Sequence, residues 1–269
     1  MERDPMPDVA ALMDAAWPAA EREELGGWVL RAAAGVTQRA NSAWPRDPGG
    51  DPARQLAALR SARLWYRNRR LPLIFQMFQD AGSAPLHAVL DAEGFTRQSE
   101  TLVLVREAGA WPGPASDPVS GPADAGVELA TTPSAEWLRL WWSVDGRGDE
   151  AALAIARGIL EGCPALYALL RDDVGAPAAV GRLAVPAGAA GWGGLYCMAT
   201  RPDARRRGYA ARILKALLGA GADRGVGAYW LLVTSANAGA RELYAGAGFS
   251  EAGRYLYRQE RPKRHLTGC

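Results

Sequence analysis

Residues 198–210 read Met198-Ala199-Thr200-Arg201-Pro202-Asp203-Ala204-Arg205-Arg206-Arg207-Gly208-Tyr209-Ala210. This segment joins the end of a predicted strand to the start of a predicted helix over 208–222. Apolar residues recur in that helix every three or four positions. The N-terminus of a helix attracts anions because its first backbone N–H groups have no partner within the helix. The segment therefore predicts a diphosphate site, where Gly208 lets the backbone approach the ligand and Ala210 keeps the helix start free of bulk. Three arginines and a glycine also fit a solvated basic turn.

The elements around this segment alternate between strands and helices. A serine at position 134, followed by a glutamate in the first turn, is typical of a helix start. Strands are predicted over 127–131, 165–171, 178–185, 194–200, 229–234 and 253–259. Helices are predicted over 134–144, 150–160, 208–222 and 238–246. This order predicts an α/β fold with a mixed sheet flanked by helices.

A second motif follows the strand over 229–234. It reads Asn237-Ala238-Gly239-Ala240-Arg241-Glu242-Leu243-Tyr244-Ala245-Gly246-Ala247-Gly248-Phe249. Together the two motifs resemble the GNAT (GCN5-related N-acetyltransferase) superfamily, whose signature is Arg/Gln-x-x-Gly-x-Gly/Ala and a later Asn-x-x-Ala-x-x-Leu-Tyr-x-x-x-Gly-Phe. The first pattern is filled by Arg205, Gly208 and Ala210. The second is filled by Asn237, Ala240, Leu243, Tyr244, Gly248 and Phe249. The resemblance covers about residues 126–260.

The resemblance implies a chemistry as well as a fold. Acetyl-CoA would be the co-substrate, and an amine would attack its thioester directly in a ternary complex. The backbone N–H of Met198 would face the thioester oxygen, and Tyr244 would protonate the departing thiolate. The implied coenzyme-binding residues are Met198, Ala199, Thr200, Arg205, Arg206, Arg207, Gly208, Tyr209, Ala210, Asn237 and Tyr244.

Several of these residues also fit a structural role. Tyr244 shares a helical face with apolar neighbours, which is typical of a core tyrosine. Asn237 fits a helix cap, a role compatible with ligand binding. Arg205 and Arg206 fit a solvent position from which they attract phosphate only diffusely. Cys197 has no histidine nearby to activate its thiol, so we expect a small core residue rather than a nucleophile.

The general base is not evident from the sequence. The strand that leads to the arginine loop contains no acid, although many GNAT enzymes place one there. Water, Tyr196 and the acids Asp145, Asp149 and Glu150 remain as alternatives. The tryptophans of the first two predicted helices slightly favour an apolar or aromatic acceptor.

The first half of the chain looks like a degenerate copy of the second. When Gly94-Phe95 is aligned with Gly248-Phe249, every element finds a partner, but Leu90 stands in place of Tyr244 and Ser83 in place of Asn237. Residues 51–56, which replace the diphosphate loop, lack its glycine. The Pro- and Gly-rich segment 108–125 predicts a linker. We therefore expect two tandem GNAT-like domains, a degenerate one over 1–107 and a catalytic one over 126–269.

Composition narrows the class of protein. The 269 residues are 49% hydrophobic, and 31 Lys and Arg against 29 Asp and Glu give a net charge of +2, which argues against a protein that coats nucleic acid or membranes. No apolar stretch is long enough to span a membrane, and no signal-peptide pattern opens the chain, so a cytoplasmic location is expected. The spacing of the three cysteines and two histidines predicts no metal site.

Three functions fit the sequence. The first is acetyl-CoA-dependent N-acetylation of a primary amine, with a small molecule favoured as acceptor. The second is the same fold acting with another acyl-CoA or an oxygen acceptor. The third is a non-catalytic acyl-CoA-binding regulatory module. The sequence leaves the acceptor and the oligomeric state open.

Overall fold

The computed structural model describes residues 8–107 and 126–261, which form two compact units. Unit 1 comprises Met1–Pro18, Val103–Val233 and Asn237–Ala252. Unit 2 comprises Ala19–Leu102, Thr234–Ala236 and Gly253–Cys269. The linker predicted over 108–125 lies outside the described residues. Every helix in the described part of the chain is too short or too polar to cross a membrane.

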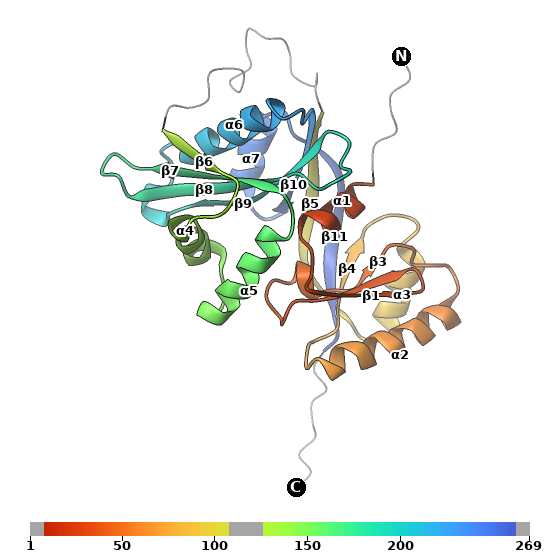
Figure 1. Ribbon diagram of the computed structural model, residues 1–269. Coiled ribbons are helices and arrows are strands. Elements are labelled where there is room, and N and C mark those ends of the chain that lie inside the picture. Colours follow the sequence, from red (N-terminus) through yellow and green to blue (C-terminus); the bar gives the residue numbers. More distant parts are fainter. Residues whose placement is uncertain (1–7, 108–125, 262–269) are drawn as a thin grey trace, which may run out of the picture. The chain divides into compact units, whose positions relative to one another are not determined.

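Unit 1 contains a mixed sheet with helices on both faces, as predicted. Its strands are β6 (Val127–Ala130), β7 (Ala165–Arg171), β8 (Pro177–Ala184), β9 (Trp192–Thr200) and β10 (Ala228–Thr234). Its helices are α1 (Val9–Ala16), α4 (Ala135–Asp145), α5 (Glu150–Glu161), α6 (Tyr209–Ala222) and α7 (Ala238–Gly246). The strands from β6 to β9 are antiparallel neighbours, and β10 runs parallel to β9. Figure 1 shows α6 and α7 above this sheet and α4 and α5 below it.

Two contacts fix the helices to the sheet of unit 1. On one face, the indole N–H of Trp137 in α4 donates to the carbonyl oxygens of Ala168 (3.0 Å) and Gly181 (3.2 Å). On the other face, a Cβ at Gly181 would lie 2.6 Å from a methyl carbon of Ile213 in α6. A glycine is therefore needed where α6 packs closely on β8.

Unit 2 has the same order of elements as the second half of unit 1. Its strands β1 (Glu21–Leu25), β2 (Trp28–Ala32) and β3 (Trp44–Pro45) are antiparallel, and a parallel bridge between Ala43 and Phe75 follows β3. The 3-10 turn η1 (Arg39–Asn41) precedes β3, and α2 (Pro52–Asn68), β4 (Ile74–Phe78) and α3 (Ala84–Ala92) follow it. The alignment of Gly94 with Gly248 brings α3 onto α7 without an offset, which confirms the predicted internal repeat.

The two halves exchange their last strands. The first half ends in β5 (Thr96–Glu107), which lies between β11 and β10 in the sheet order. The second half ends in β11 (Ser250–Gln259), which pairs antiparallel with β4 from Gln259↔Ile74 to Tyr255↔Phe78. Each of these strands begins in one unit and ends in the other. The compact units therefore do not follow the expected boundaries 1–107 and 126–269, because strand pairing joins segments that sequence order separates.

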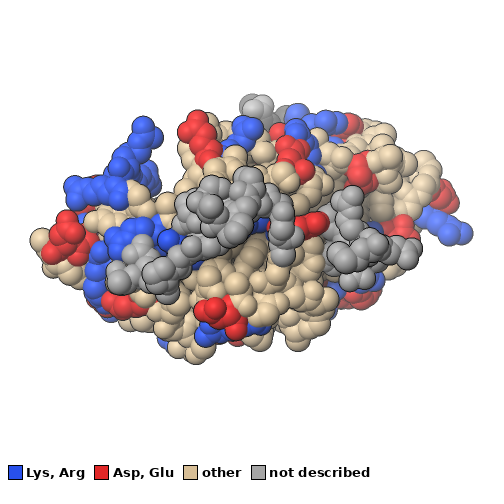
Figure 2. All heavy atoms as spheres, turned by 90° about the horizontal axis from the view of Figure 1, so that it is seen from above, with Lys and Arg blue, Asp and Glu red and all other residues tan. Residues whose placement is uncertain are grey.

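Basic and acidic side chains are interspersed on the face of the molecule shown in Figure 2, in agreement with the small net charge of +2.

Candidate active site

The parallel strands β9 and β10 pair along only part of their length. Their ladder runs from Ala228↔Trp192 to Leu231↔Leu195, whereas β9 continues to Thr200 and β10 to Thr234. Beyond Leu195 the two strands diverge, so the β10-facing edge of residues 196–200 does not continue the ladder. Backbone N–H and C=O groups on such an edge can pair with an extended ligand. The divergence therefore makes this edge of β9 a candidate binding site.

A β-bulge in β9 lies at the point of divergence. The pairs Val180↔Ala199 and Arg182↔Tyr196 leave Gly181 opposite two residues, Cys197 and Met198. Cys197 adopts φ +54°, a left-handed conformation that is typical of one class of bulge. The extra residue directly follows Tyr196, the first residue of β9 beyond the β9–β10 ladder. Cys197 is only half-buried, so the expected core position is wrong, and the residue instead forms the bulge.

The loop after β9 leaves the start of α6 open. Gly208, the N-cap of α6, adopts φ +79°, and no atom lies within 4 Å of the position of a Cβ there. No side chain caps the first turn of α6, so its N–H groups stay available to an anion. The preceding Arg205, Arg206 and Arg207 are all exposed. These residues place positive charge beside an uncapped helix N-terminus.

Arg201 has a different role from the three arginines that follow it. Its guanidinium donates to Asp172 at 2.8 Å and to Asp203 at 2.6 Å. Because two carboxylates already neutralise it, Arg201 holds the shape of the loop and adds little positive field for a ligand.

Helix α7 brings the second motif to the site. The side-chain oxygen of Asn237 accepts a hydrogen bond from the N–H of Ala240 at 3.1 Å, so Asn237 caps the helix. Tyr244 is 7% exposed and meets the ring of Phe249 edge-on at 6.0 Å. Burial raises the pKa of Tyr244 to about 12, and the negative charge of Asp145 adds to this effect. The phenol is therefore protonated at neutral pH and able to donate a proton.

Asp145 approaches the same place from the opposite face of the sheet. It is the last residue of α4, one turn beyond Trp141, whose side chain is hydrogen-bonded to it. Burial raises the pKa of Asp145, while Arg205 and Arg147 act in the opposite direction. Its side chain is nonetheless exposed to water.

The other candidates for the base occupy different environments. Asp149 accepts a hydrogen bond from the N–H of Ala152 at 3.0 Å and caps α5. Glu150 is exposed in the first turn of α5. The hydroxyl of Tyr196 accepts a hydrogen bond from the indole N–H of Trp230 at 3.0 Å, and the residue is 5% exposed. Among the named acids, Asp145 is the one whose charge acts on Tyr244.

An aromatic cluster lies beside Asp145 on the α4 face. Trp17, which follows α1, stacks on Tyr196 of β9 with ring centroids 5.5 Å apart, and it meets Trp141 edge-on at 6.4 Å. The fully buried Arg182 of β8 donates to the carbonyl oxygens of Ala16 (3.1 Å) and Leu160 (2.9 Å). Arg182 therefore ties α1 and α5 to the sheet.

The packing of Trp17 on Tyr196 was not evident from the sequence. It lies in the first half of the chain, far in sequence from the strand it covers, and no local pattern links it to β9. A lone tryptophan before a proline gives no signal of the partner it will meet. Within residues 8–107 and 126–261, no three or more His, Cys, Asp or Glu side chains gather in one place.

Strand β9, the glycine-led α6 and the later α7 follow one another as the two motifs predicted for an acetyltransferase of the GNAT superfamily. The chain belongs to the family described as "Probable histone acetyltransferase Rv0428c C-terminal", whose model matches residues 8–258. The match covers both halves of the chain, including the half that carries neither motif.

Two curated relatives support this assignment. The chain is 25% identical over 259 residues to the "Uncharacterized N-acetyltransferase YobR" of Bacillus subtilis, covering 96% of this chain and 100% of the relative. It is 32% identical over 214 residues to the "Probable histone acetyltransferase Rv0428c" of Mycobacterium tuberculosis. That match covers 78% of this chain and 60% of the mycobacterial protein. The chain is thus an acetyltransferase of the GNAT type.

Solved structures share the fold. A GCN5-related N-acetyltransferase from Kribbella flavida matches with a TM-score of 0.66 and 22% identity, covering 96% of this chain and 95% of that one. A tandem GNAT protein from the clavulanic acid biosynthesis pathway matches with a TM-score of 0.64 and 17% identity, covering 82% and 76%. The predicted tandem arrangement of GNAT-like domains thus has a counterpart among known structures.

Proposed function

We propose that the chain transfers an acetyl group from acetyl-CoA to the primary amine of a small molecule, by direct attack within a ternary complex. The observation that supports this most strongly is the gap where β9 and β10 diverge, beside the uncapped N-terminus of α6. A coenzyme with a diphosphate at one end and an extended amide-containing arm at the other fits these two neighbouring features.

The residues that would hold acetyl-CoA follow the chain from the loop to the strand. Backbone N–H groups over 206–210 would bind the diphosphate, with the side chains of Arg205, Arg206 and Arg207 adding positive charge. The edge of Met198, Ala199 and Thr200 would pair with the amide-containing arm. The side-chain N–H₂ of Asn237 would donate to the same arm while its oxygen caps α7. When bound, acetyl-CoA supplies the activated acetyl group.

Two groups would act on the reacting atoms. The backbone N–H of Met198 belongs to the bulge, outside the assigned pairs of the β8–β9 ladder, and would stabilise negative charge on the carbonyl oxygen. The Tyr244 phenol would donate its proton toward the leaving sulfur. Because burial raises its pKa to about 12, the phenol stays protonated at neutral pH and would hydrogen-bond to the sulfur as negative charge develops there.

Asp145 would accept the proton of the acceptor amine. It lies on the α4 side of the sheet, opposite the helix that carries Tyr244, and its charge acts on Tyr244. A carboxylate with a raised pKa is a stronger base than an ordinary one. This assignment selects one of the alternatives that the sequence left open.

A protein lysine is the second candidate acceptor. It is favoured by the family match, since the family is described as a probable histone acetyltransferase. Free small amines and lysine-containing basic peptides differ in size and in charge. One assay can therefore compare the two acceptor classes directly.

The test is to incubate the full chain with acetyl-CoA and a panel of aliphatic amines, aromatic amines and lysine peptides, and to measure thiol release. We expect release that depends on one class of amine and yields an acetylated product by mass spectrometry. Acetyl-CoA binding without release for any amine or alcohol would instead support the non-catalytic module. Release with alcohols alone, or with another acyl-CoA alone, would support the related transfer reactions.

A further inference from the structure

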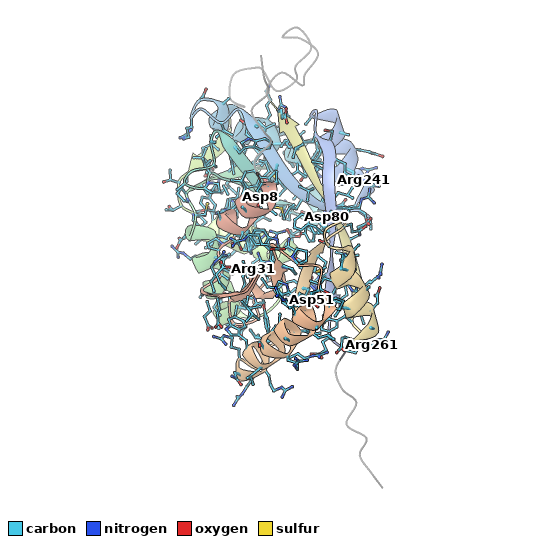
Figure 3. The ribbon with its side chains drawn as sticks, turned by 90° about the vertical axis from the view of Figure 1, so that its right-hand side faces the viewer. Asp8, Arg31, Asp51, Asp80, Arg241 and Arg261 are labelled. Atoms are coloured by element: carbon cyan, nitrogen blue, oxygen red, sulfur yellow. The ribbon has the colours of Figure 1, made fainter. Side chains whose placement is uncertain are left out.

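Unit 2 contains a cavity that the acetyl-transfer site does not use. Its volume is about 1010 Å³, at the upper end of the range of small-molecule sites. It lies between the C-terminal half of α2, the turn after α3 and the end of β11, where Figure 3 labels Arg261. Its charged lining consists of Arg63, Arg67, Arg70, Arg261, Glu93 and Glu260.

The charges in this lining do not balance. Arg63 bridges both acids, with its guanidinium 2.9 Å from Glu93 and 2.7 Å from Glu260. The remaining arginines make no side-chain ion pair or hydrogen bond within residues 8–107 and 126–261; they are Arg67, Arg70 and Arg261. Both carboxylates are thus engaged by a single guanidinium. The cavity retains an excess of positive charge with free hydrogen-bond donors.

Arg70 lies at a position past the helix end where the backbone conformation favours glycine. It adopts φ +56° just past the end of α2, and its N–H donates to the carbonyl oxygen of Arg67 at 2.9 Å. Helices commonly end with a glycine in this left-handed position, because a side chain there is strained. An arginine at this point therefore needs a further reason. Attraction to the free carbonyl groups at the helix C-terminus is one, and a bound anion is another.

We propose that this cavity binds a small, multiply charged anion whose phosphate or carboxylate groups are held by Arg67, Arg70 and Arg261. Planar guanidinium groups donate two parallel hydrogen bonds to either kind of oxyanion, and several of them favour a ligand with more than one such group. The Arg63 bridge forms the wall between α2, α3 and β11. This proposal is independent of the transfer reaction, since every lining residue belongs to unit 2.

The experiment titrates pyrophosphate and citrate separately into the full chain at low salt, by calorimetry. The test variant is Arg67→Gln combined with Arg70→Gly, and the matched control is Arg60→Gln, which removes a charge from α2 outside the cavity lining. We expect the double variant to bind at least about tenfold more weakly, and the control to bind within about twofold of the unchanged chain. The loop before α6 is the same in the unchanged chain, the double variant and the control. A difference in anion affinity among them therefore reports on the cavity.

The outcomes separate the ligand classes and the competing explanation. Stronger binding of pyrophosphate indicates a phosphorylated ligand, and stronger binding of citrate indicates a polycarboxylate. Failure of the unchanged chain to bind either anion at about 10 mM would overturn the proposal. Undiminished binding by the double variant would do so as well. If the double variant has a lower melting temperature but binds the anions normally, Arg67 and Arg70 stabilise the C-terminus of α2 and do not bind a ligand. The glycine at position 70 relieves backbone strain, so we expect the variant to fold.

Discussion

The loops that lead into α6 and α2 occupy the same place in the internal repeat, yet only the loop before α6 leaves its helix without a side-chain cap. Before α6, Gly208 leaves the helix N-terminus without a side-chain cap. Before α2, the carboxylate of Asp51 accepts the N–H of Ala53 at 2.9 Å, and Figure 3 labels this residue at the start of the helix. The side-chain N–H₂ of Gln55 donates to the carbonyl oxygens of Pro48 (3.0 Å) and Gly49 (2.7 Å). A negative charge and an amide thus occupy the place that, before α6, we propose for the diphosphate.

The helices that follow differ in the same way. Tyr244 in α7 corresponds to Leu90 in α3, which is fully buried and carries no proton to donate. Ser83, which corresponds to Asn237, makes no side-chain cap for α3. The repeated backbone therefore persists with quite different side chains at its functional positions. The fold requires apolar residues at helical or strand periodicity. The site requires, in addition, a few polar groups and one helix N-terminus without a side-chain cap.

The largest expected effect comes from closing the open loop. Gly208→Val should abolish the rise in melting temperature that acetyl-CoA produces by binding the folded state, with a loss of affinity on the order of 10²–10³-fold from lost charge-assisted hydrogen bonds. The matched control is Gly49→Val. Gly49 also has a positive φ and an open Cβ position, and it belongs to the loop before α2. A control variant that loses binding equally would remove the distinction between the loops.

Tyr244→Phe should lower kcat by about 10²-fold and leave acetyl-CoA affinity within a few-fold. A lost proton donor weakens the transition state and changes ground-state binding little. The ring keeps its edge-on contact with Phe249, so the melting temperature should barely move. Steady-state kinetics and thermal unfolding check the two parts. An unchanged kcat would reduce Tyr244 to the packing role that Leu90 has in α3.

Asp145→Asn should lower kcat/KM by about tenfold or more near neutral pH. The raised pKa of Asp145 places the base in its active form only above that pKa. Without this base, only acceptor molecules whose amine is already deprotonated can react. The activity of the variant should therefore recover as pH rises through the pKa of the acceptor amine. Glu150→Gln serves as the control on the same side of the sheet. Superimposable pH profiles for the Asn variant and the unchanged chain would exclude Asp145 as the base.

The smallest effect concerns the stability of unit 2. The ring of His87 in α3 contacts the carbonyl oxygen of Phe78 at 3.1 Å and the guanidinium of the fully buried Arg258 at 3.1 Å. Burial, together with the charge of Arg258, lowers the pKa of His87. The unfolded chain therefore binds this proton first, and stability should fall as pH drops below about 6.5.

Because water partly screens the ring, this change should stay below about 1 kcal/mol. Denaturant unfolding between pH 7.5 and 5.5 measures it. The variant His87→Gln retains one donor and one acceptor and does not titrate, so its stability should stay flat over this range. A slope that is the same in both proteins would place the titrating group elsewhere.

Much of the fold and of the site could be predicted from local sequence. The apolar period over 208–222, the glycine before it and the motif from Asn237 to Phe249 act through near neighbours, so they identified α6, α7 and the open helix start. The repeat was also visible, because apolar spacing survived in the half that lost Tyr244 and Gly208. Asp145 remained one of several alternatives, since nothing in its surroundings along the chain distinguishes it from Asp149, which caps α5.

The sequence by itself determined the GNAT class, the order of elements and the difference between the two loops, because periodicity, capping and loop chemistry depend on residues close together in the chain. Only the tertiary structure decided the exchange of β5 and β11, the packing of Trp17 on Tyr196 and the divergence of β9 from β10. Backbone hydrogen bonds between strands are the same for any sequence, so pairing is settled by which distant segments bury their apolar faces together. A fragment over 126–269 therefore lacks β5, the strand that lies between β10 and β11 in the sheet order.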